Sequence, residues 1–157
     1  MTIELYTIGK TDSEEINALI SDYSKRINRS VKFSITTLPD VRNTRKMPVE
    51  QQKQAEGEML LRQLKPEDCV ILLDEHGEEM RSVEFAEFLE RRMGSGAKRL
   101  CFVIGGPYGF SKDVYARSDI KISLSQMTFS HQLVRVIFAE QLYRGISIIN
   151  HTPYHHE

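Results

Sequence analysis

The sequence contains no tryptophan and only two cysteines among its 157 residues. Cys69 and Cys101 stand in separate apolar runs and show neither a disulfide framework nor a zinc-binding spacing, so we expect small core residues in a reducing compartment. No apolar run approaches the roughly 20 residues that a membrane-spanning helix needs, and the amino terminus lacks the pattern of a signal peptide. We therefore expect a cytoplasmic protein with no membrane partner.

An excess of either charge is also missing, since 21 basic and 22 acidic side chains leave a net charge of −1. Any nucleic-acid binding must then depend on local basic patches rather than on an overall positive field. Hydrophobic residues make up 40% and charged residues 27%, which is typical of a globular protein. Because the chain has neither repeats nor low-complexity segments, we expect residues 1–157 to form one domain.

Two kinds of apolar pattern alternate along the chain. Runs with period two, or apolar throughout, predict strands, and runs with apolar residues three and four positions apart predict helices. The expected strands are Thr2–Ile8, Val31–Leu38, Asp68–Asp74, Cys101–Ile104 and Asp119–Ser123. The expected helices are Ser13–Ile27, Val49–Lys65, one starting at Ser82, Ser111–Arg117 and Ser130–Ile149. This order predicts an α/β fold, with a mostly parallel sheet of about five or six strands and flanking helices.

The same patterns predict how individual helices begin and which sides they bury. Asp12 is the expected N-cap of the first helix, and Ser82 is that of the third. We expect Leu19 to lie in the apolar stripe of the first helix. In the last helix, Leu133 belongs to the expected apolar side, which is typical of a core or a dimer contact, whereas Arg135 is expected on another side.

A glycine-rich turn follows the strand Cys101–Ile104, in the order C-F-V-I-G-G-P-Y-G-F. The chain then restarts as a helix at Ser111, so that a strand, a glycine turn and a helix N-terminus succeed one another. In α/β proteins such a succession builds ligand sites at the carboxyl ends of strands; the alternative is a tight turn that needs glycine for its backbone alone. A second turn, E-H-G-E-E, is expected after Asp74, and in a normally ordered sheet the two turns lie side by side.

Several nucleotide and metal motifs are absent. Gly9-Lys10-Thr11 ends like a phosphate-binding loop, but Glu4 occupies the position where that motif has its first glycine. No G-x-G-x-x-G follows the first strand, which disfavours a dinucleotide enzyme on an ordinary doubly wound sheet. The tail histidines, His151, His155 and His156, fit no usual ligand spacing, and we predict no metal site.

Basic side chains cluster in the loop Asp40–Pro48, which carries Arg42, Arg45 and Lys46. The loop is either simply solvated or a flexible arm that contacts a polyanion. Arg26 and Arg29, near the end of the first helix, suit a helix C-terminus whether or not they also contact phosphate.

The carboxyl-terminal third contains three motifs in order: F-V-I-G-G-P-Y-G-F, L-S-Q-M-T-F-S-H-Q-L-V-R-V-I-F-A-E-Q-L-Y-R and the P-Y-H ending. Through these motifs it resembles the SPOUT class of methyltransferases. Within that class the whole chain, including I-L-L-D-E-H-G, is similar to the family that methylates N3 of a pseudouridine in bacterial 23S ribosomal RNA. Ser130 is a departure, because the family usually has proline there, and the serine is expected at most to loosen the start of the last helix.

The resemblance implies a C-terminal trefoil knot, which periodicity does not reveal, and S-adenosylmethionine as the methyl donor. It also implies a homodimer that acts on 23S ribosomal RNA in the large subunit, and it favours the assembled 70S ribosome as the substrate. By position, the family's cofactor contacts fall on Leu73, Gly105, Leu124, Ser125, Gln126, Met127, Thr128 and Phe129. Apolar walls and backbone groups suit an adenine ring, and Gly105, which lacks a Cβ, lets a ligand approach closely.

Methyl transfer to a ring nitrogen requires alignment of the reacting atoms and departure of a proton. The candidates for assisting that departure are His131, Arg135, Tyr154 and His155. Histidine has a suitable intrinsic pKa, and arginine can pair with phosphate or stabilise an anion. Each side chain also has a structural alternative, as a cap, a surface ion pair or a tail residue. A non-catalytic ribosome-binding factor that keeps a vestigial pocket is the other functional interpretation.

Overall fold

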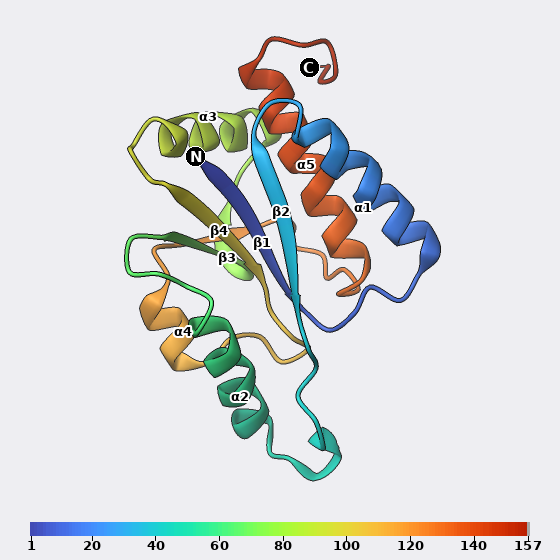
Figure 1. The fold of residues 1–157 in the computed structure, drawn as a ribbon, viewed down its shortest axis with the longest axis vertical. Helices are drawn as coiled ribbons and strands as arrows, with labels where there is room; N and C mark the ends of the chain where they lie inside the picture. The colour runs from blue at the N-terminus through green and yellow to red at the C-terminus, as the bar shows by residue number, and fades with distance from the viewer. Residues whose placement is uncertain (157) are drawn as a thin grey trace.

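The computed structural model describes residues 1–156, which form a sheet covered by helices on both faces (Figure 1). The strands are β1 (Thr2–Ile8), β2 (Lys32–Leu38), β3 (Cys69–Glu79), β4 (Arg99–Ile104) and β5 (Ile120–Ser123). The helices are α1 (Glu14–Ile27), η1 (Thr44–Lys46, a 3-10 turn), α2 (Val49–Leu61), α3 (Ser82–Met93), α4 (Lys112–Arg117) and α5 (Leu133–Ile149). Neither α5, with 17 residues, nor any other helix in this described part is long and apolar enough to cross a membrane.

All strand pairs of the sheet are parallel, in the order β2-β1-β4-β3-β5. β1 pairs with β2 on one side and with β4 on the other, so that Thr2 lies opposite both Lys32 and Arg99. β3 and β4 are neighbours, and their last pair joins Leu73, where the first part of β3 ends, to Ile104 at the carboxyl end of β4. The predicted α/β class and parallel sheet are confirmed.

Alternate residues of each strand enter two separate cores, as the two-residue period of a strand requires. One core packs Ile3, Leu5 and Phe102 against the face covered by α1, α3 and α5. The other packs Tyr6 and Val103 against the face covered by α2 and α4. Burial on both faces explains why the central strands are almost continuously apolar.

β3 is longer than the sequence suggests, and the expected turn E-H-G-E-E is wrong. After an irregularity beyond Leu73 the strand resumes, and Glu78 and Glu79 pair with Ile122 and Ser123 of β5. Gly77 makes this second pairing possible, because a Cβ at that position would lie 2.6 Å from backbone atoms of Ile122. A close backbone approach of this kind depends on a distant strand, which local sequence does not report.

Two predicted helix caps are displaced by one residue. The N-cap of α1 is Ser13 rather than Asp12, since the Ser13 hydroxyl accepts a hydrogen bond from the Ile16 N–H. The N-cap of α3 is Arg81 rather than Ser82, and the Glu84 carboxylate accepts from the Arg81 N–H at 2.7 Å. At α1, serine and aspartate both satisfy free helix N–H groups, so the residue type alone does not choose between Asp12 and Ser13.

The expected sides of α1 and α5 also need correction. Leu19 is 47% exposed and Leu133 is 45% exposed, so neither belongs to the core of this chain. Arg135 is only 2% exposed, although it was expected on another side than the apolar one. Its guanidinium donates to the carbonyl oxygens of Ile8 at 2.9 Å and Gly9 at 2.8 Å, which explains how a charged group is accommodated inside.

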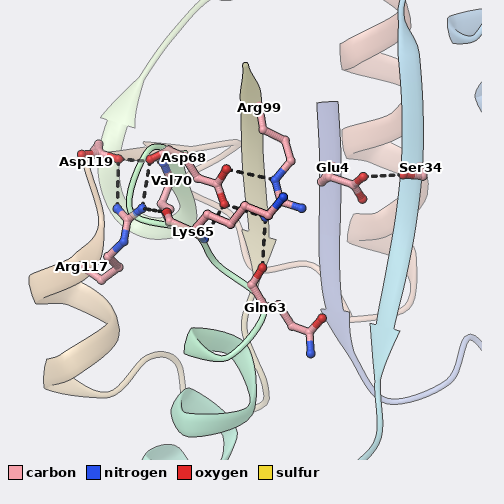
Figure 2. A network of polar contacts seen from close by, with 9 residues as sticks. All are labelled: Glu4, Ser34, Gln63, Lys65, Asp68, Val70, Arg99, Arg117 and Asp119. Carbon is pink, nitrogen blue, oxygen red and sulfur yellow. Dashed lines mark hydrogen bonds and ion pairs between the residues drawn. The ribbon is translucent and has the colours of Figure 1, made fainter. Parts of the chain in front are cut away.

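A network of charged side chains closes the amino-terminal edge of the sheet (Figure 2). Asp68, just before β3, accepts hydrogen bonds from Arg99 of β4 at 3.0 and 2.6 Å and from the Lys65 N–H at 2.7 Å. Arg117, at the end of α4, donates to the carbonyl oxygens of Lys65 and Asp68. Burial alone would raise the pKa of Asp68, but these hydrogen bonds and the Arg99 charge together lower it. The network lies opposite the edge where the glycine turn is found.

Candidate active site

A cavity of about 590 Å³ lies at the carboxyl ends of β3 and β4. Its walls come from segments that are far apart in the sequence: the residues after Leu73, the turn from Ile104 to Phe110, and the loop that leads from β5 to α5. The volume is within the range of small-molecule sites, about 300–1,000 Å³. The two segments expected to lie side by side, after Asp74 and at Gly105, both line it.

Most of the predicted cofactor contacts surround this cavity. Seven of the eight positions are lining residues: Leu73, Gly105, Leu124, Ser125, Met127, Thr128 and Phe129. Gln126 is the remaining one, and its side-chain amide instead donates to the Glu79 carboxylate at 3.1 Å. The structure therefore gathers residues from three distant segments into one place that an adenine-containing ligand could fill.

The glycine turn is held in shape by its own backbone and by the helix that follows. The Gly109 N–H donates to the Gly106 carbonyl at 3.2 Å. Ser111 then caps α4, as predicted, by accepting from the Val114 N–H at 3.3 Å. A Cβ on Gly105 would lie 3.0 Å from the ring of Phe110, so there is little room for a larger residue.

Asp74 and Tyr115 form a polar contact on the cavity wall that sequence reasoning missed. The Tyr115 hydroxyl donates to Asp74 Oδ2 at 2.5 Å, and the His76 N–H donates to Oδ1 at 3.0 Å. Burial, together with this hydrogen bond and the charge of Asp74, raises the pKa of Tyr115 to about 12, so the hydroxyl keeps its proton at neutral pH. The carboxylate is therefore fixed in orientation beside the cavity. No spacing in the sequence joins residues 41 positions apart.

The loop between β5 and α5 is shaped by its serines. Ser123 donates to the Ser125 carbonyl at 3.0 Å, and the Ser125 hydroxyl accepts from the Met127 N–H at 2.9 Å. Ser130 Oγ accepts from the Leu133 N–H at 3.1 Å, three residues before α5 begins, and the N-cap of α5 itself is Gln132.

Of the four catalytic candidates, only His131 lines the cavity. Arg135 lies one turn further along α5 and is committed to the chain's own backbone: beyond Ile8 and Gly9, it donates to the Thr11 hydroxyl at 2.8 Å and the His131 carbonyl at 3.1 Å. Burial lowers the pKa of Arg135, and the negative charges of Asp12 and Asp40 partly oppose that effect. The geometry thus gives Arg135 a structural role between β1 and α5.

The other two candidates, Tyr154 and His155, belong to the tail that follows the carboxyl end of α5, and Figure 1 shows this tail at the other end of the helix from the start of α5. The Tyr154 hydroxyl is 3.3 Å from that of Tyr23 and donates to Glu140 at 3.2 Å. Between Leu133 and Glu140 the helix rises about 10 Å at 1.5 Å per residue. The tail of this chain therefore does not fold over its own cavity.

The tail joins a compact cluster of aromatic and charged groups. The Arg144 guanidinium lies 4.8 Å from the centre of the Tyr154 ring, pairs with Glu140, and contacts His155 Nδ1 at 3.1 Å. Because arginine only donates, His155 Nδ1 must accept, which leaves the proton of a neutral ring on Nε2. That nitrogen is buried and has no hydrogen-bond partner among residues 1–156. Burial is the largest cause of the raised pKa of Tyr154.

The predicted basic residues fall into two groups that lie apart (Figure 1). Arg26 pairs with Asp22 at 3.2 Å and lies over the rings of Tyr23 and Tyr143, beside the tail cluster. The loop that contains Arg42, Arg45 and Lys46 lies at the other end of the molecule, around η1. One chain does not present them as a single patch. Residues 1–156 hold no group of three or more His, Cys, Asp or Glu side chains arranged for a metal.

Comparisons with known proteins give a consistent result over the whole length. The family model described as "Predicted SPOUT methyltransferase" matches residues 1–155. A protein of Christiangramia forsetii named ribosomal RNA large subunit methyltransferase H is 53% identical over 156 residues, which is 99% of each chain. Proteins of the same name from Flavobacterium psychrophilum and Bacteroides thetaiotaomicron are 52% and 49% identical over 157 residues, which is 100% of each chain.

Proposed function

The chain belongs to the SPOUT methyltransferase family, and from this premise we propose that it methylates N3 of a pseudouridine in 23S ribosomal RNA, with S-adenosylmethionine as the donor. The observation that carries the proposal is the cavity at the ends of β3 and β4, together with relatives named ribosomal RNA large subunit methyltransferase H. A large-subunit substrate, within the assembled 70S ribosome, is part of the same proposal.

The residues around the cavity fit this donor. Leu73, Leu124 and Phe129 offer apolar walls, and the adjoining main chain offers N–H and C=O groups to the edges of an adenine ring. Asp74, held by Tyr115, places a carboxylate where it can accept hydrogen bonds from a ligand's hydroxyl groups. When bound, S-adenosylmethionine supplies an electrophilic methyl group, so the chain's task is to bind, align and exclude water.

A proton must leave the ring nitrogen during transfer, and His131 is the candidate at the cavity. Tyr154 and His155 lie beyond the far end of α5, too distant to act in the same cavity of one chain. In a homodimer, the tail of one subunit can border the cavity of the other. The exposed apolar side chains of Met127 (78%) and Leu133, close to the cavity, favour such an association.

A homodimer would also allow the two groups of basic side chains to bind the same RNA. The two basic groups lie at opposite ends of one folded subunit: one is at the end of α1, with Arg26 and Arg29, and the other is around η1, with Arg42, Arg45 and Lys46. Two subunits can bring unlike ends together beside a cavity, where these cations contact RNA phosphates. Binding to ribosomal RNA should then weaken steeply as salt is raised.

Calorimetric titration with S-adenosylmethionine tests the donor site. We expect saturable binding by the wild type and none by Gly105→Arg, whose side chain must enter a space already limited by Phe110. Gly94→Arg is the matched control, because Gly94 ends α3 with nothing but its own helix backbone nearby, 3.5 Å from a Cβ. If the wild type fails to bind both alone and with ribosomes present, the proposed donor is wrong.

A further inference from the structure

Glu56, in α2, carries a buried carboxyl group that the site described above does not use. The residue is only 4% exposed. Oε1 has no hydrogen-bond partner among residues 1–156, and Oε2 accepts one long hydrogen bond from Gln52 at 3.4 Å. Buried polar groups are nearly always partnered, because an unpaired group costs free energy. The position of Glu56 suggests why this cost is tolerated.

The carboxyl group lies directly beneath the glycine turn. A Cβ on Gly106 would lie 2.5 Å from each of the two carboxyl oxygens. The next residue of α2, Gly57, lies against the other end of the same segment, since a Cβ there would be 2.5 Å from Ser111 Oγ. α2 therefore supports the turn at both ends, through Glu56 below Gly106 and Gly57 below Ser111.

We propose that Glu56 is a positioning residue for the methyl donor: its buried carboxyl group fills the space beneath Gly106 and holds the Gly105–Phe110 turn in its binding shape. The inference rests on the proposed function, because it places the donor in the cavity that this turn lines. Glu56 does not line that cavity, so it acts through the turn rather than by contact with the ligand.

The groups around Glu56 favour its uncharged form. Burial raises the pKa of Glu56 above its usual value, and the negative charge of Asp40 adds to the rise, against a smaller opposing effect of the Gln52 hydrogen bond. Lys53 lines the small cavity next to Glu56, but its ammonium group pairs with Glu50 at 3.4 Å.

The small space around the Glu56 carboxyl group also disfavours its charged form. The cavity beside Glu56, bounded by Gly105, Gly109 and Phe110, measures about 10 Å³, which is room for about one water molecule. A carboxylate needs several hydrogen bonds, so hydration of Glu56 requires the turn and α2 to move apart. Donor affinity should therefore be highest at low pH, where Glu56 is neutral, and should fall as the pH rises through its raised pKa.

Calorimetric titration with S-adenosylmethionine from pH 5 to pH 8 tests this dependence. Glu56→Gln keeps the size and stays uncharged, so we expect it to bind as the wild type does at pH 5 and to lack the wild type's loss of affinity at pH 8. Every other titratable group is the same in both proteins, so its contribution cancels in the comparison. Thermal unfolding of each protein at each pH establishes that it is folded.

The contact itself is tested by a double-mutant cycle. Glu56→Ala should weaken donor binding about tenfold if only a tenth of the molecules keep the turn in its binding shape. Gly106→Ala should weaken it by a similar factor in the wild type, because its methyl group meets the carboxyl oxygens. In the Glu56→Ala background, Gly106→Ala should reduce donor affinity by a much smaller factor.

The outcomes separate the inference from the function. Equal pH dependence of the wild type and Glu56→Gln, or losses that simply multiply in the double variant, would overturn the role of Glu56 while leaving the donor site intact. Failure of the wild type to bind at every pH would instead contradict the proposed function.

Discussion

Replacement of Arg135 by methionine separates a structural role from a catalytic one. Methionine keeps an unbranched stem of similar reach but removes the donors that serve Ile8, Gly9 and Thr11. Each hydrogen bond from a charged group is worth about 1.5–3 kcal/mol, and unsatisfied buried carbonyl groups cost about 1–3 kcal/mol each. Part of this is offset, because removal of a buried cation relieves its desolvation.

The net loss for Arg135→Met should be about 3 kcal/mol, which lowers Tm by about 6–12 °C in a domain of this size. Arg91→Met, at an exposed position in the last turn of α3, is the control and should change stability by about 0.5 kcal/mol or less. Urea unfolding at fixed protein concentration measures the free energy of unfolding of both variants. If Arg135→Met unfolds at the same midpoint as the wild type yet abolishes methyl transfer, Arg135 acts on the substrate and the structural assignment is wrong.

Three further predictions concern other parts of the molecule. Asp68→Asn should cost about 3 kcal/mol at pH 7, because Arg99 loses its carboxylate partner and keeps only the Gln63 carbonyl. Since the pKa of Asp68 is lowered, the difference in the free energy of unfolding from wild type, measured with urea, should be fully present above the ordinary value of 3.8 and should disappear as the pH falls through the lowered pKa. Tyr115→Phe should weaken S-adenosylmethionine binding several-fold by calorimetry with little change in Tm, because it frees Asp74 to reorient; unchanged binding would remove Asp74 from the site. Sedimentation at micromolar concentration should show a dimer, and a monomer alone would contradict the shared site.

The parallel sheet was predictable because each strand carries its own signal. Residues 100–104 and 69–73 are apolar throughout, which is typical of strands covered on both faces, and the alternation with helices leaves few arrangements. The glycine turn was predictable for a similar reason, since Gly105 and Gly106 break a buried strand immediately before the cap at Ser111. Local chemistry decides these features.

Other features depend on contacts that local sequence does not encode. β3 continues past Asp74 because Gly77 meets the backbone of β5, about 45 residues later in the chain. Arg135 is buried because carbonyl groups at the end of β1 face it, although its position in the helix suggested a polar surface. The trefoil knot stays a prediction of the family resemblance, since periodicity carries no information about threading.

The candidate site divides in the same way. The cofactor positions came from the family's motifs, and the structure brings Leu73, Gly105 and Phe129 around one cavity. The catalytic positions did not converge, because His131 and Tyr154 lie at opposite ends of α5. Because these residues lie so far apart in one chain, the proposed chemistry requires the tail of a second subunit at the cavity.

Transfer of a labelled methyl group from S-adenosylmethionine to ribosomes that lack the modification tests the central claim most directly. The assay compares 70S ribosomes, free large subunits and free ribosomal RNA, and mass spectrometry identifies the labelled nucleoside. We predict N3-methylpseudouridine in 23S ribosomal RNA of 70S ribosomes with the wild type and no label with Gly105→Arg. A wild-type protein that binds the donor but labels none of the three substrates would contradict the account.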